Sequence, residues 1–279
     1  MYEDYNKLTY KEQRELIKYI NDNYKLTTKE INNKIQNILD SKNKEQRKLI
    51  LSITPLIVLL WNKNSKKIIG SSENIMQDTW LFFEYVSVKK LNNSKVLLSS
   101  NDIAKRIQTT IKKRESIIKW NNITKSNTRL LDRRVRNIIK SGISNNKTAR
   151  QIREELTKTM NLNKGKAKSI AVTETNYYKS ESKLQSGRLH QSKGNTIIKT
   201  WIYTYMSNEH RPNHIMANGQ KVVGIDTKFN VGGKSTIAPQ HFGIASEDIN
   251  CSCDYKIEYM EDVDTSITEY NNYKEEKNG

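Results

Sequence analysis

The sequence is poor in cysteine, proline, glycine and apolar residues. Its 279 residues include 2 Cys, 3 Pro and 11 Gly, and 35% are hydrophobic. Two cysteines are too few to staple a small secreted fold, and the scarcity of helix breakers favours long helices. Compact domains are roughly 45–50% apolar. We therefore expect much of the chain to be extended helix or loop, or to pack on partners.

Long apolar runs are also absent. The longest, residues 49–61, spans 13 residues, whereas a membrane-spanning helix needs about 20. The first five residues lack the basic and then apolar pattern of a signal peptide. We expect no contact with a membrane and a protein that stays in a cytosol-like compartment.

Positive charge is what the chain has in excess. It carries 48 Lys and Arg against 30 Asp and Glu, a net charge of +18. Residues 1–102 have a net charge of +5, residues 103–199 of +18, and residues 200–279 of −5. A solvated helical face is the ordinary explanation of a basic run. A net +18 in one block of 97 residues nevertheless favours contact with a polyanion, because self-repulsion grows with charge density.

Periodicity places many of these cations on expected helices. Ile103, Ile107 and Ile111 form a narrow apolar stripe, and Leu131 and Val135 lie on a second one. The cations lie away from these stripes, where they would contact the phosphates of double-stranded DNA without sequence preference. The candidate residues are Lys105, Arg106, Lys112, Lys113, Arg114, Arg129, Arg133, Arg134, Arg136, Lys140, Lys164, Lys166 and Lys168.

The overall pattern predicts an α+β fold, with a mainly helical N-terminal region followed by a mixed helical and small β lobe. We place the helical region at residues 1–120, a second domain at 121–260 and an acidic tail, expected to be disordered, at 261–279. Within the first region, Thr27 and Glu30 have the spacing of a helix-capping box.

The second domain is expected to begin with helices and end in β structure. Helices are predicted at about 124–141, with Gly142 as the stop signal, at about 147–160 and at about 164–192. Alternation over Thr196–Met206 predicts a strand. Further β pieces are expected at 221–225 and near Phe229, with a two-residue hairpin turn at Asn218-Gly219.

Three of the four histidines and both cysteines lie within residues 210–253. Two cysteines and two histidines make a sensible Zn²⁺ set in a reduced compartment. The ordinary alternative is that the histidines bond the backbone in turns and the cysteines are small buried apolar residues. The spacing is not that of a standard zinc finger, so we expect no cofactor. The alternative is a zinc site formed by His214, His241, Cys251 and Cys253.

Catalysis through this cluster would need a general acid or base, and Glu209, Asp226, Glu247 and Asp248 lie nearby in sequence. The sequence has no HExxH, P-loop, GxSxG or paired-carboxylate motif. We therefore expect no enzyme and no catalytic residues.

An ordered set of short motifs carries a family resemblance over about residues 145–255. A helix motif with Thr-Glu-Thr is followed by a Trp-containing strand, an Arg-Pro-Asn-His element, an Asn-Gly pair and Asn-Cys-Ser-Cys. The residues concerned are Thr173, Glu174, Trp201, Arg211, Pro212, His214, Gly219, Asn250, Cys251 and Cys253. This order resembles the phage Mu F-like family, the head morphogenesis or minor head proteins of tailed bacteriophages. Val172 and Ser252 stand where that family usually has arginine.

The resemblance implies a non-enzymatic, low-copy internal head protein. Such a protein would associate with the portal or major capsid protein during assembly in the host cytoplasm and then reside in the virion head. The basic block would bind the packaged DNA through its phosphates. Two alternatives stay open: a metal-dependent enzyme acting on nucleic acid or cell wall through the His/Cys cluster, and an assembly protein that has no role with DNA.

Overall fold

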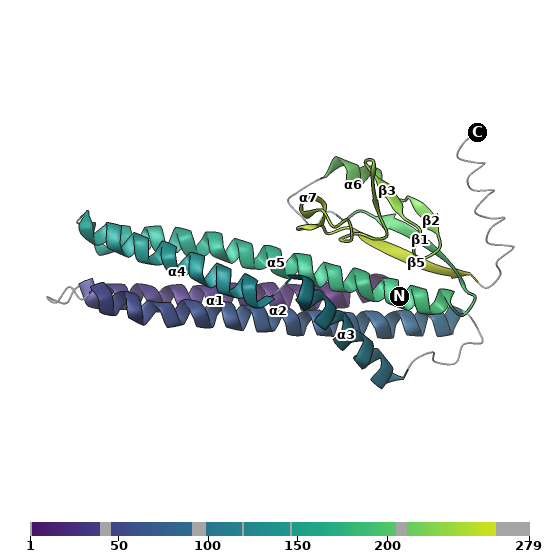
Figure 1. Cartoon of the computed structure of the whole chain (residues 1–279), viewed down its shortest axis with the longest axis horizontal. Helices are drawn as coiled ribbons and strands as arrows, with labels where there is room; N and C mark the ends of the chain where they lie inside the picture. Colours follow the sequence, from purple (N-terminus) through teal and green to yellow (C-terminus); the bar gives the residue numbers. More distant parts are fainter. Residues whose placement is uncertain are drawn as a thin grey trace. The chain divides into compact units, whose positions relative to one another are not determined.

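The computed structural model describes residues 2–39, 46–90, 99–118, 120–145, 147–204 and 211–260. Its helices are α1 (Tyr2–Leu39), α2 (Gln46–Lys90), α3 (Ser100–Ile118), α4 (Trp120–Ser144), α5 (Ala149–Gln191), α6 (Pro212–Met216) and α7 (Ala245–Asp248) (Figure 1). Its strands are β1 (Thr196–Ile202), β2 (Lys221–Val223), β3 (Phe229–Val231), β4 (Lys234–Thr236) and β5 (Asp254–Met260). The predicted α+β class is confirmed. The expected tail, 261–279, lies outside the described residues.

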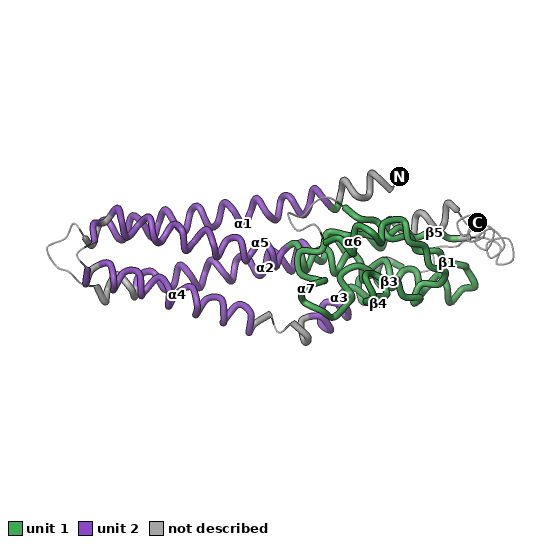
Figure 2. The backbone as a smooth tube through the Cα atoms, turned by 90° about the horizontal axis from the view of Figure 1, so that it is seen from above, with its two compact units in different colours: residues 1–9, 72–108, 172–279 green, residues 10–71, 109–171 purple. Residues whose placement is uncertain are grey.

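The chain divides into two compact units (Figure 2). Unit 1 comprises residues 1–9, 72–108 and 172–279, and unit 2 comprises residues 10–71 and 109–171. Four of the helices, α1, α2, α3 and α5, contribute residues to both units. None of the helices in the described part of the chain has an apolar stretch long enough to cross a membrane.

Unit 2 is built from helical segments that each bury one apolar stripe. The stripe of α4 consists of Leu131, Val135 and Ile139, four residues apart and almost fully buried, which is the spacing of one helix face. The same core contains residues of α1, α2 and α5, among them Ile20, Trp61 and Leu156. Burying each such side chain contributes roughly 1.5–3 kcal/mol.

Polar side chains bond between the helices of unit 2. The Tyr24 hydroxyl of α1 donates to Asn163 Oδ1 of α5 over 2.7 Å, and Ser65 of α2 bonds Thr124 of α4 over 2.8 Å. Buried hydroxyls and amides satisfied in this way fix how the helices pair.

The helix start predicted at Thr27 and the helix stop predicted at Gly142 are both wrong. Thr27 and Glu30 lie inside the continuous helix α1, and the predicted stop at Gly142 lies inside α4. Gly142 is instead a site of close approach, because a Cβ there would lie 2.6 Å from Ile152 Cγ1. The two helices expected at 147–160 and 164–192 form one helix, α5, since the polar residues between them do not break it.

Unit 1 contains a three-stranded antiparallel sheet in the order β2-β1-β5 and a two-stranded β3-β4 hairpin. Strand β1 pairs with β5 along its full length, from Thr196 opposite Met260 to Ile202 opposite Asp254. The core beneath it includes Trp201, Phe229 and Tyr255. The sequence analysis did not predict strand β5, although its alternating Tyr255, Ile257 and Tyr259 are typical of a strand.

The expected hairpin at Asn218-Gly219 is wrong in its details. Met216 ends the short helix α6 rather than a strand, and β2 pairs with β1. Gly219 still needs its glycine, because it has φ +81°. Its N–H donates to Trp201 O over 2.9 Å, which fixes the turn against β1.

Candidate functional site

The family motifs, distant in sequence, meet in unit 1. On α5, the Thr173 hydroxyl accepts the backbone N–H of Asn250 over 3.0 Å. Asn250 adopts φ +56°, a conformation that Asn tolerates better than most residues. Arg211 precedes α6 and donates to Ile249 O over 2.7 Å, while Pro212 occupies the first turn of α6, where a missing N–H costs nothing. These contacts hold the 249–253 segment between α5 and α6.

His214 lies at the centre of this region and is 1% exposed. Its Nδ1 is 3.6 Å from the Sγ of Cys251 and 3.5 Å from the Sγ of Cys253. On the other side of the ring, its Nε2 lies 2.9 Å from Glu247 Oε2. The second oxygen of Glu247 pairs with Lys234 of β4. The predicted grouping of His214 with both cysteines is therefore present as a buried cluster.

The cluster is electrostatically coupled. Burial lowers the pKa of His214, but hydrogen bonding and charge attraction from Cys251 and Glu247 outweigh it and raise that pKa overall. Hydrogen bonding by Cys253, with His214 adding to it against burial, lowers the pKa of Cys251 to about 5. The pKa of Cys253 is raised by the neighbouring Cys251 and by burial. Cys251 is thus the more acidic of the two thiols.

The structure places His241 apart from these three side chains. Its Nε2 lies 3.0 Å from Glu181 Oε2 and its Nδ1 is 2.9 Å from Pro239 O. Its ring stacks on Tyr177 with centroids 4.7 Å apart. His241 therefore bonds α5 and the neighbouring turn instead of completing the predicted set of four ligands. The remaining histidine of the region, at position 210, lies outside the described residues.

Two acidic residues have roles that the sequence did not reveal. Glu247 is the partner of His214, although they are 33 residues apart, and Asp254 lies at the start of β5 between two lysines. Lys183 Nζ is 2.5 Å and Lys179 Nζ 2.9 Å from the Asp254 carboxylate. Although burial raises the pKa of Asp254, the two lysines lower it well below its usual range. This ion triad fastens β5 to α5.

The predicted phosphate-contacting residues are mostly exposed. Those of unit 1 are Lys105 and Arg106, and Arg106 lies over the Trp80 ring at 6.0 Å. In unit 2, the exposed members are Lys112, Lys113, Arg129, Arg133, Arg134, Lys140 and Lys166. The half-buried members are Arg114, Arg136, Lys164 and Lys168.

The exposed face of α4 presents the densest row of these cations. Arg129, Arg133 and Lys140 project opposite the buried stripe of the same helix. Arg136 is less available, because its Nε bonds Asp132 over 2.7 Å and its Nη2 bonds Thr54 over 2.8 Å. The face can therefore attract phosphates along its length without any arrangement for reading bases.

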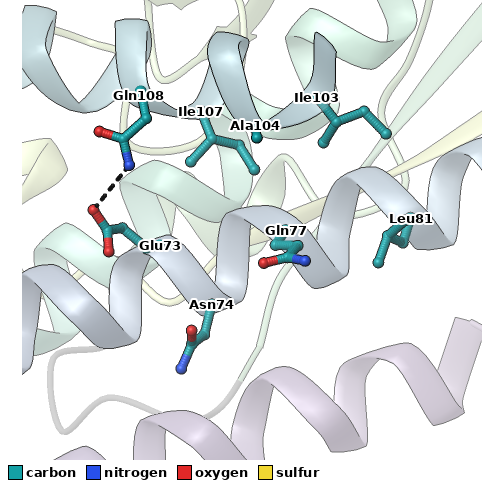
Figure 3. Close-up of a pocket in the computed structure, with 8 residues that line it drawn as sticks. All are labelled: Glu73, Asn74, Gln77, Leu81, Ile103, Ala104, Ile107 and Gln108. Atoms are coloured by element: carbon teal, nitrogen blue, oxygen red, sulfur yellow. Dashed lines mark hydrogen bonds between the residues drawn. The ribbon is translucent and has the colours of Figure 1, made fainter. Parts of the chain in front are cut away.

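A pocket of about 260 Å³ lies between α2 and α3 within unit 1 (Figure 3). The aliphatic side chains of Ile103 and Ile107 form the α3 side, and Gln77 and Leu81 the α2 side. Gln108 donates to Glu73 across one end over 3.4 Å. This pocket is lined neither by the family-motif residues nor by His214, Cys251 and Cys253. We therefore take the His/Cys cluster and the exposed basic helical faces as the candidate functional sites.

Comparison with known proteins finds a matching family and a curated relative. The model of a family described as "Phage Mu protein F like protein" matches residues 131–256. The NAD(+)–arginine ADP-ribosyltransferase EFV of Enterococcus faecalis is 29% identical over 145 residues, which cover 52% of this chain and 29% of that protein. No solved structure matches significantly. The segment that carries the motifs, residues 131–256, therefore belongs to the phage Mu protein F like family and indicates a phage head protein.

Proposed function

We propose that this protein is a minor, internal head protein of a tailed bacteriophage. It associates with the portal or the major capsid protein during head assembly in the host cytoplasm and then resides in the virion. The observation that carries the proposal is the family match over residues 131–256. The exposed cations of α4, which lie in that segment, support a further role in binding packaged double-stranded DNA.

DNA binding of this kind is carried by phosphate contacts. Each phosphate neutralised by a cation releases counterions, so the logarithm of affinity falls with the logarithm of salt concentration by about 0.9 per contact on duplex DNA. Arg129, Arg133, Arg134 and Lys140 are all exposed on α4. Replacing these four with Gln should reduce the slope by about 3 to 4, with little difference between DNA sequences.

The control variant makes the same change in charge elsewhere. Lys11, Arg14, Lys18 and Lys25 are exposed on α1, outside the basic block. Their replacement with Gln should leave the salt slope nearly unchanged. Fluorescence anisotropy with random-sequence duplexes between 50 and 300 mM salt, on the order of physiological strength, measures both slopes. DNA binding that is undetectable at moderate salt, or equal loss in the two variants, would remove the DNA part of the proposal.

Association with the head is tested separately. Full-length protein treated with nuclease should still co-purify with portal or capsid protein if protein contacts recruit it. Addition of duplex DNA should not displace it. If DNA competes with the portal for the basic face, the alternative of an assembly protein without a DNA role gains support. Absence of the protein from purified virions would overturn its assignment to the head.

We also propose that the chain has no enzymatic activity. The similarity to the ADP-ribosyltransferase includes only 29% of that protein, so the shared part need not contain its active site. In this chain, the buried His214 bonds Cys251 through Nδ1 and Glu247 through Nε2. Turnover of NAD⁺ by purified protein, or hydrolysis of nucleic acid or cell wall that His214→Ala abolishes, would contradict this.

A further inference from the structure

The spacing of three buried side chains is that of a metal centre. The Sγ atoms of Cys251 and Cys253 lie 3.6 and 3.5 Å from Nδ1 of His214, and the three ligand atoms all lie within 4.8 Å of one another. Zinc bonds of about 2.3 Å to sulfur and 2.0–2.1 Å to nitrogen, at a tetrahedral angle, put a nitrogen and a sulfur ligand about 3.5 Å apart. Both nitrogen–sulfur distances are therefore those found around a bound zinc ion.

Two sulfurs converge on one nitrogen of His214. Because the Glu247 carboxylate accepts at Nε2, the proton of a neutral His214 is on Nε2 and Nδ1 keeps a single lone pair. That lone pair can accept one thiol S–H, yet both Cys251 and Cys253 converge on it. A cation bonded to Nδ1 can bind both sulfurs at once.

The surroundings of the cluster complete this pattern. A histidine that binds a metal usually donates its other N–H to a carboxylate, which orients the ring, and Glu247 stands in that position. Glu247 is in turn paired with Lys234. Two thiolates and one Zn²⁺ sum to zero charge, as do Glu247 and Lys234. The buried centre is thereby neutral, which avoids the cost of an uncompensated interior charge.

Aromatic rings shield the site. Phe242 stacks on the His214 ring with centroids 5.4 Å apart, and Trp201 meets it edge-on at 5.8 Å. His214 lies on α6, whereas the cysteines directly precede β5. An ion held here would link two segments of unit 1 that contain little regular structure.

We propose that His214, Cys251 and Cys253 bind one Zn²⁺ ion, with Glu247 positioning the imidazole. The described residues place no further His, Cys, Asp or Glu in this group, so water or another small ligand would complete a tetrahedral site. His241 is not a ligand. The ion contributes to folding of the C-terminal lobe, since a metal bound only by the native state stabilises it.

Metal content of the full-length protein, purified without chelator from zinc-supplemented medium, tests the proposal. We expect about one zinc per chain, and protection of both thiols from a disulfide reagent until a chelator is added. Replacement of zinc by Co²⁺ should produce the near-ultraviolet charge-transfer absorption of thiolate ligands. This measurement needs no variant. Metal-free protein that neither takes up zinc nor shows this absorption would overturn the proposal.

Matched variants identify the ligands. Cys251→Ser and His214→Gln should lose zinc, whereas Ser252→Ala, between the two cysteines, and His241→Gln should keep it. If a ligand variant fails to fold, the cobalt spectrum of the unmodified protein still decides whether thiolates bind metal. Loss of zinc from His241→Gln with retention in His214→Gln would overturn the ligand assignment. None of these outcomes depends on DNA binding or head association, so the proposed function and the metal site can fail independently.

Discussion

Replacing Gly142 with alanine tests how closely α4 approaches α5. An added Cβ would lie 2.6 Å from Cγ1 and 2.7 Å from Cδ1 of Ile152, and Ile152 is 1% exposed within the core of unit 2. Overpacking of this kind costs about 1–3 kcal/mol, while alanine gains about 1 kcal/mol over glycine in a helix. We expect a net destabilisation of about 0–2 kcal/mol.

Gly165 provides the matched control. It lies in α5, also in unit 2, and a Cβ there would have nothing within 4 Å. Gly165→Ala should therefore stabilise the protein by roughly 0.5–1 kcal/mol. Urea unfolding followed by circular dichroism gives both values. Gly142→Ala should lower the free energy of unfolding and Gly165→Ala should raise it, so that the two variants differ by about 1–3 kcal/mol.

A double-mutant cycle isolates the contact. Ile152→Ala removes both atoms that would collide, and by itself costs about 2–5 kcal/mol. In that background, Gly142→Ala should no longer destabilise, giving a coupling of about 1–3 kcal/mol. If Gly142→Ala and Gly165→Ala stabilise the unmodified protein equally, the close approach of the two helices is refuted.

Three further outcomes concern unit 1. Asp254→Asn removes the partner of the buried Lys183 and should lower the free energy of unfolding by about 3–5 kcal/mol. As a control, Asp226→Asn removes one partner of an exposed ion pair and should lower it by under about 1 kcal/mol. Equal losses of the two variants in urea unfolding would contradict this. Because the pKa of Asp254 is lowered in the folded state, its contribution to the free energy of unfolding is complete above the unfolded-state pKa of about 3.9 and is lost as the pH falls below that value. Thermal melts at decreasing pH should show this loss for the unmodified protein and not for Asp254→Asn. Thr173→Val should cost about 1 kcal/mol, since the N–H of Asn250 loses its acceptor, and an unchanged melting temperature would exclude that role.

The apolar stripes were the most predictable part of the fold. Ile103, Ile107 and Ile111 are buried as their spacing predicts, because a helix face is a local property of the sequence. Helix ends were harder to predict. Gly142 has the residue type of a helix stop, yet it lies within α4, and only the position of Ile152 on another helix explains it.

The sequence predicted which residues belong to the candidate site, but not which of them contact one another. The sequence indicated that His214, Cys251 and Cys253 belong together, since they are rare residues in one segment. It did not separate His241 from them, because distance along the chain does not show that His241 faces Glu181. The role of Glu247 depends on α7 being placed beside α6, which is a tertiary property. Short motifs therefore named the parts of the site but not their contacts.

Part of the interior of unit 1 is polar, a feature that composition alone does not show. Lys199 is 0% exposed on β1, and its Nζ donates to Thr227 O over 2.8 Å and to Ile237 O over 2.6 Å. Burial lowers the pKa of Lys199 to about 8. Between this value and about 10.5, the unfolded chain binds more protons than the folded one, so Lys199 makes stability rise with pH.

Lys199→Met keeps the aliphatic stem but removes both hydrogen bonds and the titrating group. At pH 7 it should cost about 1–3 kcal/mol, because two buried carbonyls lose their donor while a desolvated ammonium is also removed. The difference should widen in favour of the unmodified protein as the pH rises toward 10, as urea midpoints at several pH values would show. Parallel pH dependences for the two proteins would mean that Lys199 titrates as a hydrated lysine. In that case, its position in the core would be wrong.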